Sequence, residues 1–347
     1  MTMNTLLESA KKARDYRNAI DYSKICTFGI KCLDDVLHGI LPKDFITIGA
    51  DSGAGKSEVC LKIAIHNARL GRKIGLYFIE GGDEEAAERI KWNLMCDKYF
   101  GTKMTGINMD YRKWRMGLLK DELISKLEDS CIAENEKVFN NIITYGYEKG
   151  MSIENFTESL DYFLKPEDGW ENDPFSYKHQ VDLIIIDHLQ YFNLANPAKE
   201  LIEQGTILKK VNEISHGYKI PVILVSHLRK KEKDRGLPSQ EDFYGTSNTP
   251  KMSSLAITMS SQASKDGIHF PTYFRFVKTR TKIPSNYALL CNYNLKLSNY
   301  EDKYTCHRLK GDMPIVEPTI RINTPECFCK SNFSNIVKTE EDLEWVE

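Results

Sequence analysis

The stretch Ala50-Asp51-Ser52-Gly53-Ala54-Gly55-Lys56-Ser57 decides the fold of this chain. An apolar, β-branched run, residues 45–49, comes directly before it and predicts a buried strand. Residues 58–68 follow it, with apolar side chains spaced along one face of a helix. Strand, glycine-rich turn and helix in this order predict a loop that binds phosphate groups.

The residue types in this loop suit phosphate binding. Gly53 and Gly55 have no Cβ atom, so the backbone can curl and turn its N–H groups inward. The first turn of the following helix adds unpaired N–H groups and a partial positive charge. Lys56 is expected to reach phosphate oxygens, and the Ser57 hydroxyl is expected to ligate Mg²⁺. Ala50 stands where the usual motif has its first glycine, and the alternative interpretation of the stretch is a chance glycine turn.

Length and composition bound the protein class. A chain of 347 residues can bury one large core plus an appendage, and 41% hydrophobic with 28% charged residues is typical of globular proteins. The net charge of −2 means that nucleic-acid binding would depend on a local basic patch. Nine cysteines without a regular spacing favour a reducing, cytoplasmic compartment. No signal peptide and no membrane-spanning run is expected, and thus no membrane partner.

Three predicted strands are each followed or ended by a chemically active side chain. Branched aliphatic residues dominate these runs, which predicts strands that are buried on both faces. The side chains at their ends are Glu80, Asp187 and His227. Because the carboxyl ends of parallel strands meet at one edge of a sheet, we expect the three to lie beside the phosphate-binding loop. The runs are residues 73–79, 181–187 and 221–227.

Asp187 is the predicted metal ligand. At that edge of the sheet its carboxylate is placed to hold the Mg²⁺ that Ser57 also ligates, directly or through water. The alternative is that Asp187 only caps a helix.

The remaining patterns predict an α/β fold in which helices flank a mainly parallel sheet. Further strands are expected at 141–145, 255–259, 273–277 and 287–293. Helices are expected at 6–22, at 84–95 with Asp83 as cap, and at 152–163 with Ser152 as cap. The first helix either faces solvent or packs on a neighbouring subunit. We divide the chain into an N-terminal helix and linker (1–24), a motor domain (25–298) and a C-terminal extension (299–347).

Five motifs in this order resemble the RecA-like motor domain of the hexameric replicative DNA helicases, of the DnaB, Twinkle and phage helicase–primase type. The resemblance covers roughly residues 25 to 298. The Asp-x-Leu-Gln motif at 187–190 is more specific than the phosphate loop, which many families share. The motifs are residues 50–57, Phe78-Ile79-Glu80, Ile186-Asp187-His188-Leu189-Gln190, Val225-Ser226-His227-Leu228 and Lys278-Thr279-Arg280.

The resemblance implies a P-loop fold that binds ATP with Mg²⁺, and a role for each matching residue. Glu80 would be the general base that orients the attacking water, and His227 would sense the γ-phosphate. Lys278 and Arg280 would reach the nucleotide of the adjacent subunit in a ring, and Tyr293 would stack on the base. The alternatives are a surface carboxylate at Glu80, a basic strand end at 278–280 and a half-buried strand tyrosine.

The nucleic-acid contacts are predicted from the loop after His227. In the resembling family, loops at this place line the central channel and hold single-stranded DNA. Backbone N–H groups, hydroxyls and lysines suit a sequence-independent grip on phosphates. Lys251 and Ser254 stand where the bacterial relatives usually have Gln and Asp, and the alternative for residues 229–235 is a solvated charged turn. The candidate contacts are Arg229, Lys230, Lys231, Lys233, Ser247, Asn248 and Lys251.

The residues after 299 lie outside the resemblance. Cys306, His307, Cys327 and Cys329 match no strong zinc pattern, and the acidic tail 339–347 is a candidate docking peptide for a replication partner. The sequence thus predicts a ring-forming helicase that moves along single-stranded DNA in replication. Two alternatives stay open: a filament-forming, RecA-type recombination ATPase, and a nucleotide-gated scaffold that recruits a replication or defence partner.

Overall fold

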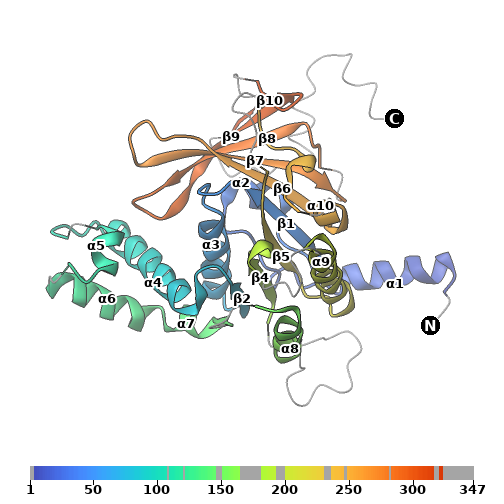
Figure 1. The fold of residues 1–347 in the computed structure, drawn as a ribbon, viewed down its shortest axis with the longest axis horizontal. Coiled ribbons are helices and arrows are strands. Elements are labelled where there is room, and N and C mark those ends of the chain that lie inside the picture. Colours follow the sequence, from blue (N-terminus) through green and yellow to red (C-terminus); the bar gives the residue numbers. More distant parts are fainter. Residues whose placement is uncertain are drawn as a thin grey trace.

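A single mixed sheet runs through the molecule, with helices against both of its faces (Figure 1). The computed structural model describes residues 4–107, 109–119, 122–145, 151–164, 181–192, 200–229, 236–245, 248–280, 283–315 and 320–322. The helices are α1 (Leu6–Asn18), α2 (Lys31–Leu37), α3 (Lys56–Arg69), α4 (Gly82–Gly101), α5 (Tyr111–Arg115), α6 (Glu122–Glu134), α7 (Glu136–Asn141), α8 (Ile153–Leu164), α9 (Glu200–Gly217) and α10 (Asn248–Met252).

The sheet has eleven described strands in the order β10-β9-β8-β7-β6-β1-β5-β4-β2-β3, and β11 pairs with β9. The part from β6 to β3 is parallel, and the pairs from β6 to β10 are antiparallel. The strands are β1 (Phe45–Ala50), β2 (Ile74–Phe78), β3 (Ile142–Thr144), β4 (Leu183–Asp187), β5 (Val222–His227), β6 (Leu255–Ser261), β7 (His269–Thr279), β8 (Tyr287–Asn294), β9 (Asn299–Lys310), β10 (Met313–Pro314) and β11 (Ile320–Ile322). The predicted α/β class is confirmed.

Alternating side chains of the central strands build one hydrophobic core on each face of the sheet. In β4, Leu183 and Ile185 belong to the core that α2, α3, α4, α6 and α7 cover. Ile184 and Ile186 point to the opposite core, which α8 and α9 cover. Burial on both faces explains why this strand reads as an unbroken aliphatic run in the sequence. The two cores fix β4 and hence the position of the carboxylate at its end.

The antiparallel strands continue past residue 298. β9 pairs with β8 over most of its length, and β10 and β11 pair with β9. In Figure 1 these strands form the orange upper part of the molecule, and α5 and α6 project to one side. The main sheet therefore includes residues beyond the point where the predicted motor domain ends.

Two predicted helix boundaries change in the structure. α4 begins at Gly82 with Gly81 at its N-cap and no side-chain cap, so the prediction that Asp83 caps this helix is wrong. Asp83 lies in the first turn, where its charge still faces the positive end of the helix dipole. α1 ends at Asn18, earlier than predicted. The Ser152 cap is confirmed, since its hydroxyl accepts a hydrogen bond from the Asn155 amide at 3.1 Å.

The core under α8 gives a stability prediction. Phe156 is fully buried and meets Tyr77 and Phe192 edge-on, at ring-centroid distances of 5.1 and 5.2 Å. We expect Phe156→Ala to lower the free energy of unfolding by about 3–5 kcal/mol, because it leaves a cavity among aromatic rings. Urea denaturation measures this change. The exposed Leu201→Ala is the control and should stay within about 0.5 kcal/mol; an equal loss in both variants would contradict the packing.

Candidate functional site

The phosphate-binding loop lies between β1 and α3, as the sequence predicts. Gly53 and Gly55 have φ angles of +78° and +90°, which residues with a Cβ atom rarely adopt. A Cβ atom built at either position meets nothing within 4 Å, so the backbone angles, and not crowding, require glycine. The space beside these two residues is open, and α3 starts directly after them at Lys56. An anion beside the loop therefore faces the amino-terminal end of the helix.

Lys56 folds back over the loop. Its Nζ atom donates hydrogen bonds to the carbonyl oxygens of Ala50 at 3.3 Å and Asp51 at 2.9 Å. The residue is only 6% exposed, and burial lowers the pKa of its amine, while the charges of Asp187 and Glu80 oppose this shift. An ammonium group held by two weak carbonyl acceptors is ready to exchange them for phosphate oxygens.

Asp187 lies at the end of β4, opposite Phe78 of β2. Its side chain is fully buried, and within the described part of the chain neither carboxylate oxygen makes a hydrogen bond. Burial raises the pKa of Asp187 to about 6, and the Glu80 charge adds to this, whereas the neighbouring Ser57 hydroxyl and Lys56 ammonium oppose it. Buried carboxylate oxygens without hydrogen bonds, next to a serine hydroxyl, fit a hard cation such as Mg²⁺.

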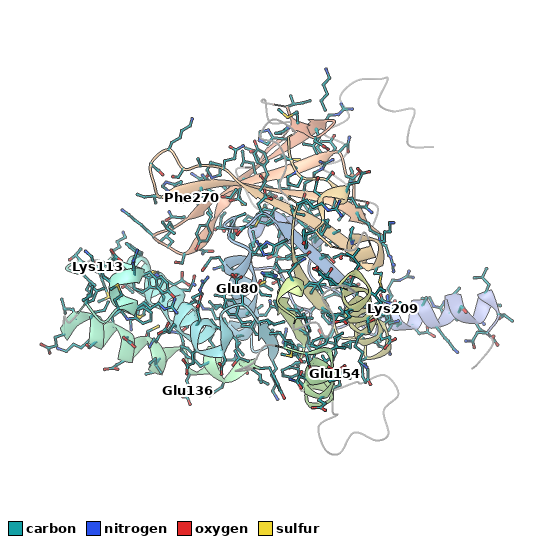
Figure 2. All side chains as sticks on the ribbon, viewed as in Figure 1. Glu80, Lys113, Glu136, Glu154, Lys209 and Phe270 are labelled. Atoms are coloured by element: carbon teal, nitrogen blue, oxygen red, sulfur yellow. The ribbon has the colours of Figure 1, made fainter. Side chains whose placement is uncertain are left out.

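Glu80 and His227 join Asp187 at the same edge of the sheet. β2, β4 and β5 are consecutive strands, and His227 pairs with Ala50 at the start of the phosphate-binding loop. The Glu80 side chain is 46% exposed and lies near the centre of the molecule, as Figure 2 shows. Burial and the charge of Lys56 lower the pKa of His227. The structure thus brings together Lys56, Ser57, Glu80, Asp187 and His227.

His188 and Gln190 belong to a motif of the sequence, but the sequence predicted no role for them. His188 is fully buried, and its Nε2 atom lies 3.4 Å from Oε2 of Glu80. Its Nδ1 atom lies 3.1 Å from Oε1 of Gln190, and its ring meets that of His227 edge-on at 4.2 Å. Burial and the neighbouring His227 lower the pKa of His188 to about 4. Only the adjacency of His188 to Asp187 in the sequence signals this position.

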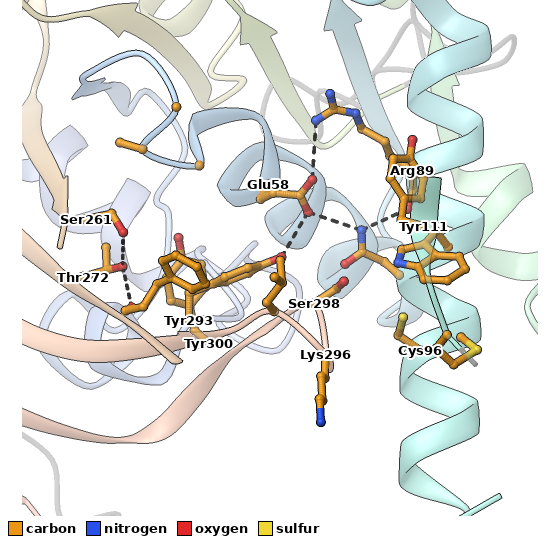
Figure 3. Close-up of a pocket in the computed structure, with 18 of the residues that line it drawn as sticks. Glu58, Arg89, Cys96, Tyr111, Ser261, Thr272, Tyr293, Lys296, Ser298 and Tyr300 are labelled. Carbon is orange, nitrogen blue, oxygen red and sulfur yellow. Dashed lines mark hydrogen bonds and ion pairs between the residues drawn. The ribbon is translucent and has the colours of Figure 1, made fainter. Parts of the chain in front are cut away.

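Tyr293 lines a pocket of about 730 Å³ on the outer side of the phosphate-binding loop (Figure 3). Its hydroxyl lies 3.4 Å from Oε2 of Glu58, and its ring meets Tyr300 edge-on at 5.1 Å. Glu58 also contacts Arg89 and Asn93 of α4, at 3.5 and 3.4 Å. Burial raises the pKa of the Tyr293 hydroxyl well above its usual value. The pocket combines aromatic walls with polar groups and opens onto the loop residues 53–55.

Lys278 and Arg280 lie at the opposite edge of the sheet from the phosphate-binding loop. Thr279 pairs with Leu255 at the start of β6, and the Arg280 amide donates to the carbonyl of Ser254 at 3.0 Å. The Lys278 ammonium donates to the carbonyl oxygen of Lys251. Burial and the charge of Arg280 lower the pKa of Lys278. These residues are therefore a full strand length away from Lys56 of the same chain.

The predicted nucleic-acid residues are only partly described. Arg229 is exposed directly after β5, and its amide donates to the Asp242 carbonyl at 2.6 Å. Lys251 is exposed on α10 next to Lys278, and Asn248 opens that helix. Arg229 and Lys251 are thus placed on different elements. Lys230, Lys231, Lys233 and Ser247 lie outside the described residues.

Comparison with protein families identifies the chain. The family described as DnaB-like helicase C terminal domain matches residues 26–244. The chain belongs to the DnaB-like helicase family. This match spans the phosphate-binding loop, Glu80, Asp187 and His227, which are the residues that the sheet gathers at one edge.

Two solved structures share the fold. The structure of a DnaB-like replicative helicase, studied for its interactions with primase, has 14% identity and a TM-score of 0.64 over 86% of this chain and 67% of that chain. A second structure, described as an ATPase domain, has 16% identity and a TM-score of 0.63 over 86% of this chain and 99% of that chain. Among curated proteins, none matches the sequence significantly. The RecA-like motor fold predicted from the motifs is thereby confirmed.

The predictions about membrane spans and zinc ligands concern other parts of the chain. Within the described ranges, every helix is too short or too polar to cross a bilayer. His307 is held by Thr305 and by the carbonyl of Ile315, at 2.8 and 2.9 Å. Cys327, Cys329 and the acidic tail 339–347 lie outside the described residues.

The raised pKa of Asp187 gives a prediction about stability. In protein free of nucleotide and Mg²⁺, the folded state holds the Asp187 proton up to about pH 6, whereas the unfolded chain releases it near pH 4. Stability therefore falls as the pH rises from 4 to 6. We expect Asp187→Asn to be more stable than wild type by about 2 kcal/mol at pH 7, and this advantage to vanish near pH 4. Urea denaturation at both pH values measures the difference, and a variant that is less stable at pH 7 would contradict the assignment.

Proposed function

We propose that this chain is an ATP-dependent DNA helicase that forms a ring and translocates along single-stranded DNA during replication. The observation that supports it best is the division of the predicted catalytic residues between two edges of one sheet. Lys56, Glu80, Asp187 and His227 lie at one edge, and Arg280 lies at the other. Membership of the DnaB-like helicase family supports the same reaction class.

The geometry explains how one subunit prepares the reaction. Lys56 and the loop amides bind the phosphates, and Ser57 and Asp187 hold Mg²⁺, which offsets phosphate charge when bound. Glu80 orients the attacking water and accepts its proton, since its partly exposed carboxylate stands beside the loop. His227, uncharged and next to Ala50, responds to the γ-phosphate. The pocket beside Tyr293 receives the nucleoside half of ATP.

The position of Arg280 requires a second subunit for catalysis. β1 is six residues long, so its two ends are about 17 Å apart. Arg280 lies beyond the start of this strand and cannot reach the phosphates held at its end. In a ring, the edge with Arg280 faces the nucleotide edge of the next copy. Hydrolysis at subunit interfaces, with Lys278 and Arg280 acting on the neighbour's nucleotide, follows from this arrangement.

DNA binding is proposed for the loop that begins at Arg229. This loop starts two residues after His227, so a change at the γ-phosphate is transmitted directly to it. Lys230, Lys231, Lys233, Ser247, Asn248 and Lys251 complete the proposed phosphate contacts. The acidic tail 339–347 is the proposed site for a replication partner.

Loss of the base and loss of the phosphate lysine have different expected effects. Glu80→Gln should lower the ATPase kcat by about 10²–10⁴-fold and still bind ATP, because only the proton acceptor is removed. Lys56→Ala should lose nucleotide binding as well. Steady-state ATPase assays with and without single-stranded DNA, together with titration of a fluorescent ATP analogue, measure both effects. The exposed Glu84→Gln on α4 is the matched control and should behave as wild type; normal turnover in Glu80→Gln would remove the base assignment.

Mixing two inactive variants tests whether Arg280 acts across an interface. Arg280→Ala should lose about 10³-fold in kcat and keep ATP binding. In a mixture with Lys56→Ala subunits, an intact Arg280 faces an intact phosphate-binding loop at some interfaces, so part of the ATPase activity should return. Activity that stays at the level of the separate variants, or a wild-type protein that remains monomeric with ATP, Mg²⁺ and DNA, would exclude the proposed arrangement.

A further inference from the structure

His188 stands directly behind the proposed base. It is fully buried, and its Nε2 atom lies 3.4 Å from Oε2 of Glu80. Its ring also meets the ring of His227 edge-on at 4.2 Å. A buried imidazole in contact with a catalytic carboxylate affects that carboxylate according to which ring nitrogen carries the proton.

The orientation of the Gln190 amide follows from its neighbours. The backbone N–H of His227 can only donate, so the atom 3.1 Å from it is the oxygen Oε1. The amide nitrogen Nε2 of Gln190 then donates to the hydroxyl of Ser226 at 3.0 Å. Ser226 is able to accept this bond because its own proton goes to the carbonyl of His227 at 3.3 Å. All three bonds agree on one orientation.

The amide orientation in turn fixes the proton on His188. Oε1 of Gln190 can only accept, and it lies 3.1 Å from Nδ1 of His188, so Nδ1 carries the proton. A neutral imidazole has one proton, and Nε2 is therefore an acceptor. Its lone pair faces the Glu80 carboxylate, which also has only lone pairs while it is charged. The contact becomes a hydrogen bond only after Glu80 has gained a proton.

We propose that His188 is a positioning residue that accepts a hydrogen bond from Glu80 once Glu80 has taken the proton of the attacking water. The inference rests on the proposed role of Glu80 as the base. In the step, the water O–H bond breaks and its proton moves to Oε2 of Glu80. The water oxygen bonds to the γ-phosphorus, and the bond from that phosphorus to the bridging oxygen breaks. The new Glu80 O–H donates to Nε2 of His188, and the proton stays on Glu80.

Such an acceptor increases the rate because it acts late in the step. Before proton transfer, the Nε2 lone pair and the carboxylate charge disfavour each other. As the proton arrives, the interaction turns favourable, so it stabilises the transition state more than the ground state. Gln190 also joins His188 to the backbone of His227, so the residue that responds to the γ-phosphate holds the ring that supports the base.

Two substitutions at the same position separate this role from a packing role. His188→Asn keeps an amide that can donate to Gln190 but has no atom at the Nε2 position. His188→Gln places an acceptor oxygen there. We expect His188→Asn to lower the ATPase kcat by about tenfold with a KM for ATP within twofold of wild type, and His188→Gln to stay within about threefold in kcat. Equal kcat values for the two variants, or a loss accompanied by a raised KM, would overturn the proposal.

A second measurement does not depend on any variant folding. In the full-length protein with nitrogen-15 labelled histidine, the two ring-nitrogen chemical shifts of His188 identify which nitrogen is protonated. A proton on Nδ1 is expected, and a proton on Nε2 overturns the inference. Glu80→Gln measured alongside separates the two levels of the argument. If Glu80→Gln turns over normally, the proposed base has failed; if it is inactive while His188 carries its proton on Nε2, only the role of His188 has failed.

Discussion

The buried charge of Asp187 is the constraint on which the rest of the site depends. The two hydrophobic cores hold β4 rigidly, and the carboxylate at its end is shielded from water without hydrogen bonds from the described residues. Such a group is unfavourable unless a cation compensates it, which is why burial raises its pKa. Lys56, Ser57 and the open loop stand where a metal ion and a triphosphate would provide that compensation. The fold therefore maintains an electrostatic demand that ligand binding satisfies.

The same sheet separates the chemistry into two halves. Parallel strands bring the phosphate-binding loop, the base and the γ-phosphate sensor to one edge, while the turn to antiparallel pairing at β6 and β7 carries Lys278 and Arg280 to the other. A single copy then holds both halves of a site but cannot close them on one nucleotide. Assembly in a ring is the arrangement in which every copy supplies one half to each neighbour, so that hydrolysis in one subunit is felt by the next.

Much of this could be predicted from the sequence because its signals are local. The strand, glycine turn and helix around residues 50–57 and the aliphatic runs before Asp187 and His227 are read directly from periodicity and composition. The site around His188 and Gln190 could not, because it depends on amide and ring contacts between β4 and β5 that no spacing reveals. The same holds for α4, where the predicted Asp83 cap gave way to Gly81, and for β9, whose pairing with β8 extends the sheet beyond residue 298.

The most direct test is an electron cryomicroscopy structure of the full chain with Mg²⁺, single-stranded DNA and an ATP analogue that resists hydrolysis. The account predicts that Lys56 leaves the carbonyls of Ala50 and Asp51 for phosphate oxygens, with Mg²⁺ held by Ser57 and Asp187. It also predicts that Arg280 from a neighbouring copy meets the same nucleotide. A nucleotide bound away from residues 50–57, or Asp187 remote from the metal, would contradict it.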